Sequence, residues 1–258
     1  MPTPALLAAD PDTTVADAAT IVMSWLEGRP RWDGSPRQRW LDQIVDTLVE
    51  LHQIEVSSPP GRIPRISRYA QSAYEPPRWS QRPQVWERAF EIFHGPIPES
   101  EDRFIHRDLH PGNLLWRRHE LTGVVDWQAA CVGPSSADPG HCRLNMFYDD
   151  PALADQLRIT WEQRSGQRYH PWADVNAIVG VLDHIRTPKN PSRARVAIEH
   201  ALANAVTDLS DRASASRRRG RCGSSGHSLL RRDCNHRICV LALVITGSTR
   251  RLGAFRSR

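Results

Sequence analysis

Lysine is almost missing from this chain of 258 residues. A single lysine, Lys189, stands among 34 Lys and Arg residues. Any site that needs a lysine is therefore excluded from residues 1–188. The preference for arginine is a matter of composition and by itself indicates no function.

Long apolar runs and an export leader are missing as well. Residues 1–11 carry no basic side chain, and the apolar runs at residues 21–23 and 238–245 are too short to cross a bilayer. We therefore expect neither a signal peptide nor a membrane partner. The five cysteines are irregularly spaced and lack the CxxC pairs of a zinc knuckle. Free cysteines without an export signal are typical of the reducing cytoplasm.

Charge is distributed unevenly along the chain. Residues 211–258 carry 12 Arg and 2 Asp, a net charge of +10, whereas residues 1–210 carry a net charge of −5. All nine Trp precede residue 173. No aromatic residue lies among the tail arginines before Phe255, so nucleic acid is not the expected partner. We interpret residues 211–258 as a disordered or out-of-frame tail.

Polar residues suited to catalysis gather between residues 104 and 127. Short strands are expected at residues 104–105, 114–116 and 124–125, with a turn at Pro111 and Gly112. The residues between the last two strands are about as many as a hairpin loop needs. A hairpin returns its second strand to the start of the first, so Asn113 and Asp126 should lie side by side.

This arrangement predicts a magnesium site with a base beside it. Mg²⁺ usually takes one or two carboxylates from the protein and leaves its other positions to water and phosphate. Asn113 and Asp126 would supply the oxygen ligands. Asp108 lies five residues before Asn113, across the turn. It can face the same space without binding the metal, which suits a group that accepts a hydroxyl proton.

Two other interpretations of these residues stay open. The sequence Pro-Gly-Asn between apolar runs can be a plain turn. In addition, His106, Asp108 and His110 alternate, so on a strand they would share one face and could bind zinc, as in a metallohydrolase. The zinc interpretation leaves Asn113 and Asp126 without a role.

The order His106-x-Asp108-x-x-x-x-Asn113, followed by Asp126 and Trp127, resembles the catalytic loop and metal-binding Asp of kinase-fold phosphotransferases. The residues of this motif are similar to those of the aminoglycoside phosphotransferase and choline kinase-like family. The resemblance covers roughly residues 5–210 and implies an α+β, protein-kinase-like fold. It implies that Asp108 is the catalytic base, that Asn113 and Asp126 hold Mg²⁺, and that His106 braces the loop.

The same resemblance implies the reaction. The γ-phosphoryl group of ATP, or of another nucleoside triphosphate, would pass to a hydroxyl of a small, cationic, aminoglycoside-like substrate. Asp138 resembles a structural Asp that follows the metal-binding Asp in this family. Asp149 and Asp150 lie where family members meet cationic substrates, although carboxylates before Pro151 are also typical of a helix N-terminus.

Three regions are expected along the chain. Residues 1–30 resemble a remnant of the nucleotide-binding lobe with its linker, in which Ser24, Trp25 and Leu26 would face adenine. Residues 31–210 resemble the helical catalytic lobe, and residues 211–258 are the tail. Expected strands lie at residues 4–9 and 19–26, a long loop at 56–83, and helices at 36–51, 84–93, 151–164, 171–185 and 192–209.

The phosphate-binding part of such an enzyme has no counterpart here. Kinase-fold enzymes place a lysine and a Gly-rich loop upstream of the catalytic loop, and neither precedes Asp108. On the family alignment the chain begins inside the nucleotide lobe. We therefore expect weak nucleotide binding and little turnover from this chain alone. The alternative function is that of a non-catalytic remnant, or pseudoenzyme, that only binds a ligand or a partner.

Overall fold

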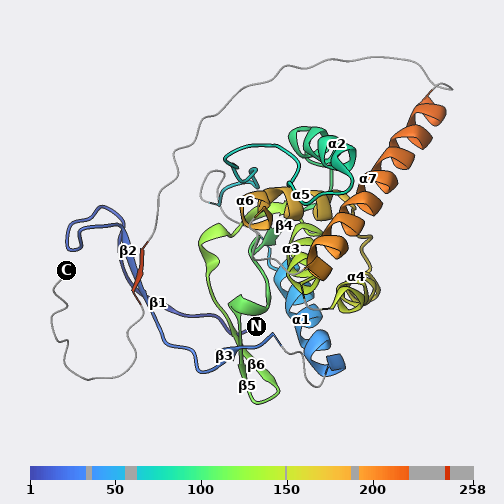
Figure 1. Ribbon diagram of the computed structural model, residues 1–258. Helices are drawn as coiled ribbons and strands as arrows, with labels where there is room; N and C mark the ends of the chain where they lie inside the picture. The colour runs from blue at the N-terminus through green and yellow to red at the C-terminus, as the bar shows by residue number, and fades with distance from the viewer. Residues whose placement is uncertain (33–36, 56–62, 149, 187–191, 221–241, 245–258) are drawn as a thin grey trace.

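Helices make up nearly half of the described residues, and a small hairpin of strands stands apart from them (Figure 1). The computed structural model describes residues 1–32, 37–55, 63–148, 150–186, 192–220 and 242–244, and the structural statements below concern these residues. The helices are α1 (Arg37–His52), α2 (Pro83–His94), α3 (Ala137–Met146), α4 (Pro151–Ser165), α5 (Trp172–Gly180), α6 (Leu182–Ile185) and α7 (Ser192–Gly220).

The helical core forms as the sequence periodicity predicts. The buried face of α1 repeats every three or four residues, from Trp40 to Leu51. Helix α3 packs against α4 and α5, while α2 packs against α5 and α7. Trp86 and Trp161 are completely buried, and the indole N–H of Trp86 donates to Glu199 at 3.0 Å. The segment of residues 104–127 joins this core through Leu109 and Leu114.

Two of the expected helices differ clearly from their predicted bounds. The helix expected at residues 171–185 is divided into α5 and α6 at Gly180, which lies close to the ring of Tyr69. Helix α7 continues past residue 209 to Gly220 and so crosses the predicted start of the tail. The rest of the tail, apart from residues 242–244, lies outside the described residues, so the expected division of the chain stays a prediction.

The strands form three small sheets. They are β1 (Leu6–Asp10), β2 (Thr20–Met23), β3 (Arg29–Pro30), β4 (Asp102–Ile105), β5 (Leu114–Arg117), β6 (Glu120–Val124), β7 (Cys131–Pro134) and β8 (Ala242–Val244). The sheet orders are β1-β2-β8, β3-β5-β6 and β4-β7. Of the described residues from 63 to 82, none belongs to a helix or to a named strand, which agrees with the expected long loop.

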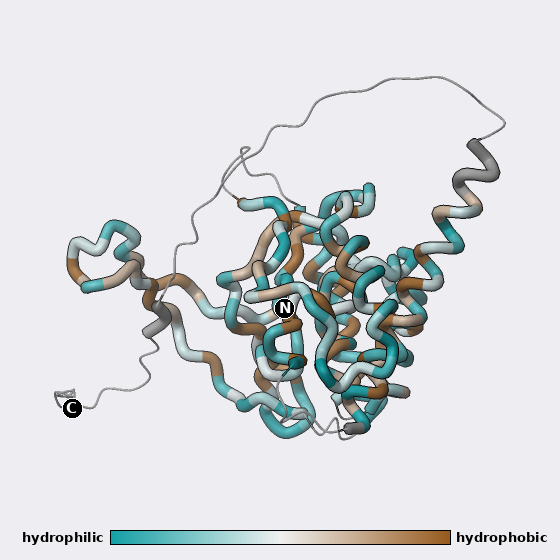
Figure 2. Tube along the Cα trace, turned by 45° about the horizontal axis from the view of Figure 1, so that its top comes forward, coloured by the Kyte–Doolittle hydropathy of each residue, from teal (hydrophilic) through white to brown (hydrophobic). Residues whose placement is uncertain are grey.

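The hairpin of β1 and β2 projects from the helical body, and several of its residues are apolar (Figure 2). The two strands are antiparallel, and Leu6 and Leu7 on β1 are 63% and 64% exposed. Strand β8 pairs with β2 in parallel. The strand, turn and strand expected in the first thirty residues are therefore present.

The hairpin of β5 and β6 carries the metal-site candidates. Its turn is tighter than expected, because Arg117 pairs with Glu120 and leaves only two residues between them. On its other edge β5 pairs with β3, which belongs to the linker. Gly28, just before β3, has a φ of +134°, and a Cβ there would lie 2.5 Å from Thr122 Oγ1. Only glycine allows the linker to pass this close to the hairpin.

No helix within the described ranges is both long enough and apolar enough to cross a membrane.

Candidate active site

The loop that follows β4 is held by a buried carboxylate. Asp138, in the first turn of α3, is completely buried and accepts from the backbone N–H groups of His106 at 3.0 Å and Arg107 at 2.6 Å. Its Oδ2 also lies 3.0 Å from Nε2 of His52 on α1. Asp138 therefore joins the loop to two helices, which is the structural position that the sequence resemblance implied.

Arg107 gives the loop its shape. Its φ of +70° lies in the left-handed region, which non-glycine residues adopt only where neighbours hold them. The two contacts with Asp138 restrain its backbone on one side. Its guanidinium lies 3.9 Å from the centre of the Tyr69 ring and donates to the Ser67 carbonyl. Residues 106–110 consequently form a loop instead of continuing strand β4.

His106 links this loop to the segment that carries Asp126. The ring is completely buried, and its Nε2 lies 3.0 Å from the carbonyl oxygen of Val125. Its Nδ1 lies 3.3 Å from the backbone nitrogen of Asp108, and the ring centre is 4.6 Å from that of Trp127. These are the contacts that a bracing residue would make, and the role of His106 stays a prediction.

Asn113 and Asp126 occupy neighbouring ends of the hairpin. The backbone N–H of Val125 donates to the Asn113 carbonyl at 3.0 Å, and Leu114 is paired with Val124. The Asn113 side-chain nitrogen donates to the Asp108 carbonyl at 2.8 Å and reaches Asp108 Oδ2 at 3.3 Å. Its amide oxygen thus remains available to a metal ion.

Asp126 also leaves its side-chain oxygens without a partner among the described residues. It adopts a left-handed conformation with a φ of +66°, and its partly buried carboxylate accepts no hydrogen bond from the described residues. Strained conformations of this kind cluster at functional sites. One amide oxygen and one carboxylate at adjacent strand ends form the donor set that Mg²⁺ accepts, so these residues fit the ion.

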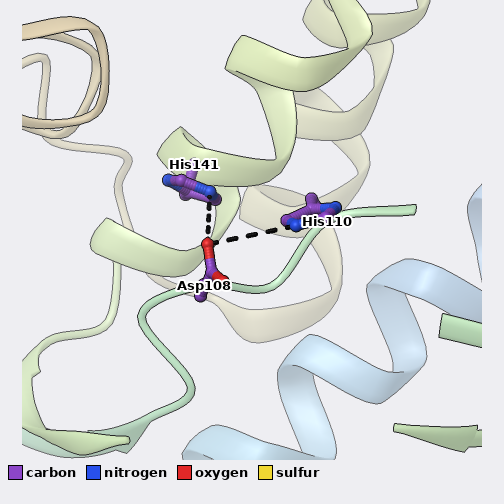
Figure 3. A group of neighbouring side chains, drawn as sticks. All are labelled: Asp108, His110 and His141. Atoms are coloured by element: carbon purple, nitrogen blue, oxygen red, sulfur yellow. Dashed lines mark ion pairs between the residues drawn. The ribbon is translucent and has the colours of Figure 1, made fainter. Parts of the chain in front are cut away.

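Asp108 has a partner that sequence reasoning missed. Nε2 of His141, on α3, lies 2.9 Å from Asp108 Oδ1, whereas Nε2 of His110 lies 4.0 Å from the same atom (Figure 3). The only sequence signal for His141 is its position three residues after Asp138, which places both side chains on one face of the helix.

The histidines affect the charge of the base. Burial alone would raise the pKa of Asp108, but the hydrogen bond from His141 and the electrostatic effect of the neighbouring histidine rings outweigh it and lower the pKa below its ordinary value. Burial lowers the pKa of His110, against the opposing effect of Asp108. Asp108 is therefore ionised, and His110 neutral, at neutral pH.

The zinc interpretation fails on geometry. His106 is turned towards Val125 and does not meet Asp108 and His110, because residues 106–110 are not a strand. Asp108, His110 and His141 do converge, with ligand atoms within 4.8 Å of one another. However, Nδ1 of His110 accepts the backbone N–H of Gly112 at 3.0 Å. Because Nδ1 accepts this hydrogen bond, the ring proton of neutral His110 lies on Nε2. A protonated Nε2 has no lone pair for a metal ion, so His110 cannot bind one while the hydrogen bond to Gly112 is present.

The three residues expected near adenine lie in the linker between β2 and β3. The backbone N–H of Ser24 is already used, because it donates to Ala5 at 2.8 Å. The Leu26 side chain lies against Gly123 of β6. Trp25 is 59% exposed. Trp25 and Leu26 stay candidates for nucleotide contact, whereas the Ser24 N–H is not available for it.

Asp150 is a helix cap with a charged partner. Its Oδ1 accepts from the backbone N–H groups of Ala152 and Leu153 at 3.1 and 3.2 Å, and its Oδ2 pairs with Arg37. Asp149 lies outside the described residues. A cavity of about 370 Å³ next to the catalytic loop is lined by Trp32, Arg37, Trp40, Pro111, Asn145, Met146, Asp150 and Leu153.

A larger cavity, of about 530 Å³, contains none of the motif residues. Its lining comes mainly from α4 and α7, and it also includes Asp174 of α5 and Arg143 of α3. Arg143 is two residues from His141, so the two side chains leave the helix on opposite faces. Of these two cavities, the smaller one includes a residue of the loop region, Pro111, in its lining.

Comparison with known proteins agrees with the kinase-fold phosphotransferase class that the sequence resemblance implied. The model of the phosphotransferase enzyme family matches residues 1–174. The chain therefore belongs to this family. No curated protein sequence matches it.

Solved structures of aminoglycoside phosphotransferases share its fold. A Ralstonia eutropha JMP134 protein, described as a candidate aminoglycoside phosphotransferase, has a TM-score of 0.55 at 18% identity, over 80% of this chain and 78% of that one. APH(4)-Ia, solved with ADP and hygromycin B, has a TM-score of 0.52 at 13% identity, over 80% and 77%. The expected α+β, kinase-like fold is confirmed.

Proposed function

We propose that this protein transfers the γ-phosphoryl group of ATP, or of another nucleoside triphosphate, to a hydroxyl of a small molecule. The observation that carries the proposal is the contact between Asp108 and Asn113 beside the hairpin end that leads into Asp126. Asp108 contacts Asn113, and the backbone of Asn113 is hydrogen-bonded to the residue before Asp126. Family membership and the nucleotide-bound structure of APH(4)-Ia add support.

Asp108, Asn113 and Asp126 have different roles in the proposed in-line transfer. Asp108 orients the acceptor hydroxyl and takes its proton, while Asn113 and Asp126 would hold Mg²⁺. The ion would neutralise the charge that develops on the transferring group. Asp138 and His106 keep the loop in register with the hairpin. Catalysis of this kind is mainly positioning and electrostatics.

Replacement of the base tests the reaction. ADP release would be followed with Mg-ATP and a panel of amino sugars and choline-like alcohols as acceptors. We expect Asp108→Asn to lower kcat by about 10²–10⁴-fold, the usual contribution of a general base. The matched control is Asp208→Asn, which removes an exposed carboxylate on α7. Asp108→Asn enzyme with the parent rate would refute the assignment.

The cavity beside the catalytic loop supports a cationic acceptor. Two indoles and the Asp150 carboxylate line it, and aromatic faces and carboxylates both attract cations. A positively charged substrate would compete with Arg37 for Asp150. Asp150→Asn retains the helix cap, since Asn and Asp cap equally well. It should therefore raise KM for a cationic acceptor without unfolding α4, and an unchanged KM would contradict this assignment.

Binding without transfer is the competing function. It is favoured by the absence of any lysine in residues 1–188, because kinase-fold enzymes hold the nucleotide phosphates with one. We expect this chain alone to bind Mg-ATP weakly. Calorimetry with Mg-ATP, alongside the ADP assay, separates the cases. Nucleotide binding with no ADP release for any acceptor would favour the pseudoenzyme, and tight binding would contradict the expected role of the missing lysine.

A further inference from the structure

Helix α3 reaches the catalytic loop through two side chains, Asp138 and His141, one turn apart. Asp138 holds the loop backbone at His106 and Arg107. His141 contacts the Asp108 carboxylate itself, 2.9 Å away, and only 9% of its side chain is exposed. A buried helix therefore determines both the path of the loop and the orientation of the reacting group.

The two oxygens of Asp108 have different surroundings. Oδ1 faces the imidazole of His141. Oδ2 lies on the side of Asn113, whose side-chain nitrogen is 3.3 Å away. A carboxylate has about four sites for hydrogen bonds, so the long contact with Asn113 leaves Oδ2 with room for another donor. About a third of the Asp108 side chain is exposed, at 34%, which lets a substrate approach.

We propose that His141 is a positioning residue for Asp108: by donating from Nε2 to Oδ1 it presents Oδ2 to the acceptor hydroxyl. This inference rests on the proposed function. In the transfer, the hydroxyl proton moves to Oδ2 as the hydroxyl oxygen bonds to the γ-phosphorus. The bond from that phosphorus to the bridging oxygen breaks, and the nucleoside diphosphate leaves with the bonding electrons.

His110 does not share this role. Its Nδ1 is engaged by the Gly112 N–H in the turn, and its ring stacks on Trp32 with centres 5.7 Å apart. Its Nε2 stands 4.0 Å from Asp108, which is too long for a hydrogen bond. The two histidines thus divide their tasks: His110 stabilises the turn and His141 orients the base.

The first test compares His141→Ala with His141→Gln. Glutamine can place an amide N–H near the position of the imidazole Nε2, whereas alanine removes the donor. We expect His141→Ala to lower kcat by about 10²-fold, as small misplacements of reacting groups do, with KM for Mg-ATP unchanged. His141→Gln should restore most of the loss. His200→Ala, an exposed histidine on α7, is the matched control, and urea midpoints check that each variant folds.

The second test does not depend on turnover. A hydrogen-bonded ring proton on Nε2 of His141 should give a slowly exchanging signal in ¹H–¹⁵N spectra, and Asp108→Ala should accelerate its exchange with water. An unchanged exchange rate would overturn the contact. If Asp108→Asn is inactive but folded His141→Ala keeps the parent kcat, the positioning role fails while the proposed function stands. If Asp108→Asn is as active as the parent, the proposed function fails with it.

Discussion

Asp138→Ala is expected to destabilise the protein strongly, because one buried carboxylate serves three donors. It accepts from two consecutive backbone N–H groups, those of His106 and Arg107, and contacts the ring of His52. Neither Asp138 nor His106 has any exposed surface, and His52 is only 3% exposed. Water therefore cannot replace the missing acceptor at two of the three positions.

The magnitude follows from the groups left unpaired. A buried donor that loses its partner costs about 1–3 kcal/mol. The His106 backbone N–H and the His52 ring would each lose their acceptor in this way, whereas the loss at the partly buried N–H of Arg107 is smaller. We expect the free energy of unfolding to fall by about 3–5 kcal/mol, as when one partner of a buried charge pair is removed. Arg107 should then leave its left-handed conformation.

Urea unfolding followed by tryptophan fluorescence measures the loss, and amide hydrogen exchange at His106 and Arg107 locates it. Asp138→Asn keeps the volume and one acceptor oxygen, so its effect should be intermediate. Asp208→Asn, which is exposed, should change little. A loss below about 0.5 kcal/mol, the usual range for a surface substitution, would refute the reasoning, as would unchanged exchange at both amides.

Two other predictions concern stability away from the base. Gly28→Ala should lower the free energy of unfolding more than Gly166→Ala does. Both glycines have a positive φ, but a Cβ at Gly28 would lie 2.5 Å from Thr122 Oγ1, whereas a Cβ at Gly166 would have nothing within 4 Å. Equal shifts of the urea midpoint would contradict this.

Arg143→Leu should lower the free energy of unfolding by about 3–5 kcal/mol, because it leaves the buried Asp174 carboxylate without the Arg143 guanidinium, with which it pairs at 3.0 Å. Arg143→Leu/Asp174→Asn should unfold less readily than Arg143→Leu alone, and simple additivity of the two changes would rule out the coupling.

Local signals were sufficient for the strands and the turn of the catalytic segment. Pro111 and Gly112 mark a turn whatever surrounds them, and the apolar runs on either side have few other conformations available. The adjacency of Asn113 and Asp126 then follows from the geometry of a hairpin. These features depend on residues close in sequence, which is why they could be predicted.

The features that were missed depend on contacts between distant segments. Gly180 ends α5 where the ring of Tyr69 lies beside it, yet the apolar period runs through the break. His141 looks like an ordinary helix residue until α3 is packed under the loop. In the same way, the alternation of His106 with Asp108 suggested a shared face only because the left-handed turn at Arg107 was not foreseen.

The two-residue strand β3 is the joint between the projecting hairpin and the helical body. Arg29 and Pro30 pair with Trp116 and Leu115, within three residues of Asn113. A movement of the hairpin would reach the strand that follows Asn113 through this pairing, while Met1, before β1, contacts Glu50 of α1. Motion of the hairpin would therefore reach the candidate metal-binding residue Asn113 through this short ladder, and stiffening the ladder should damp it.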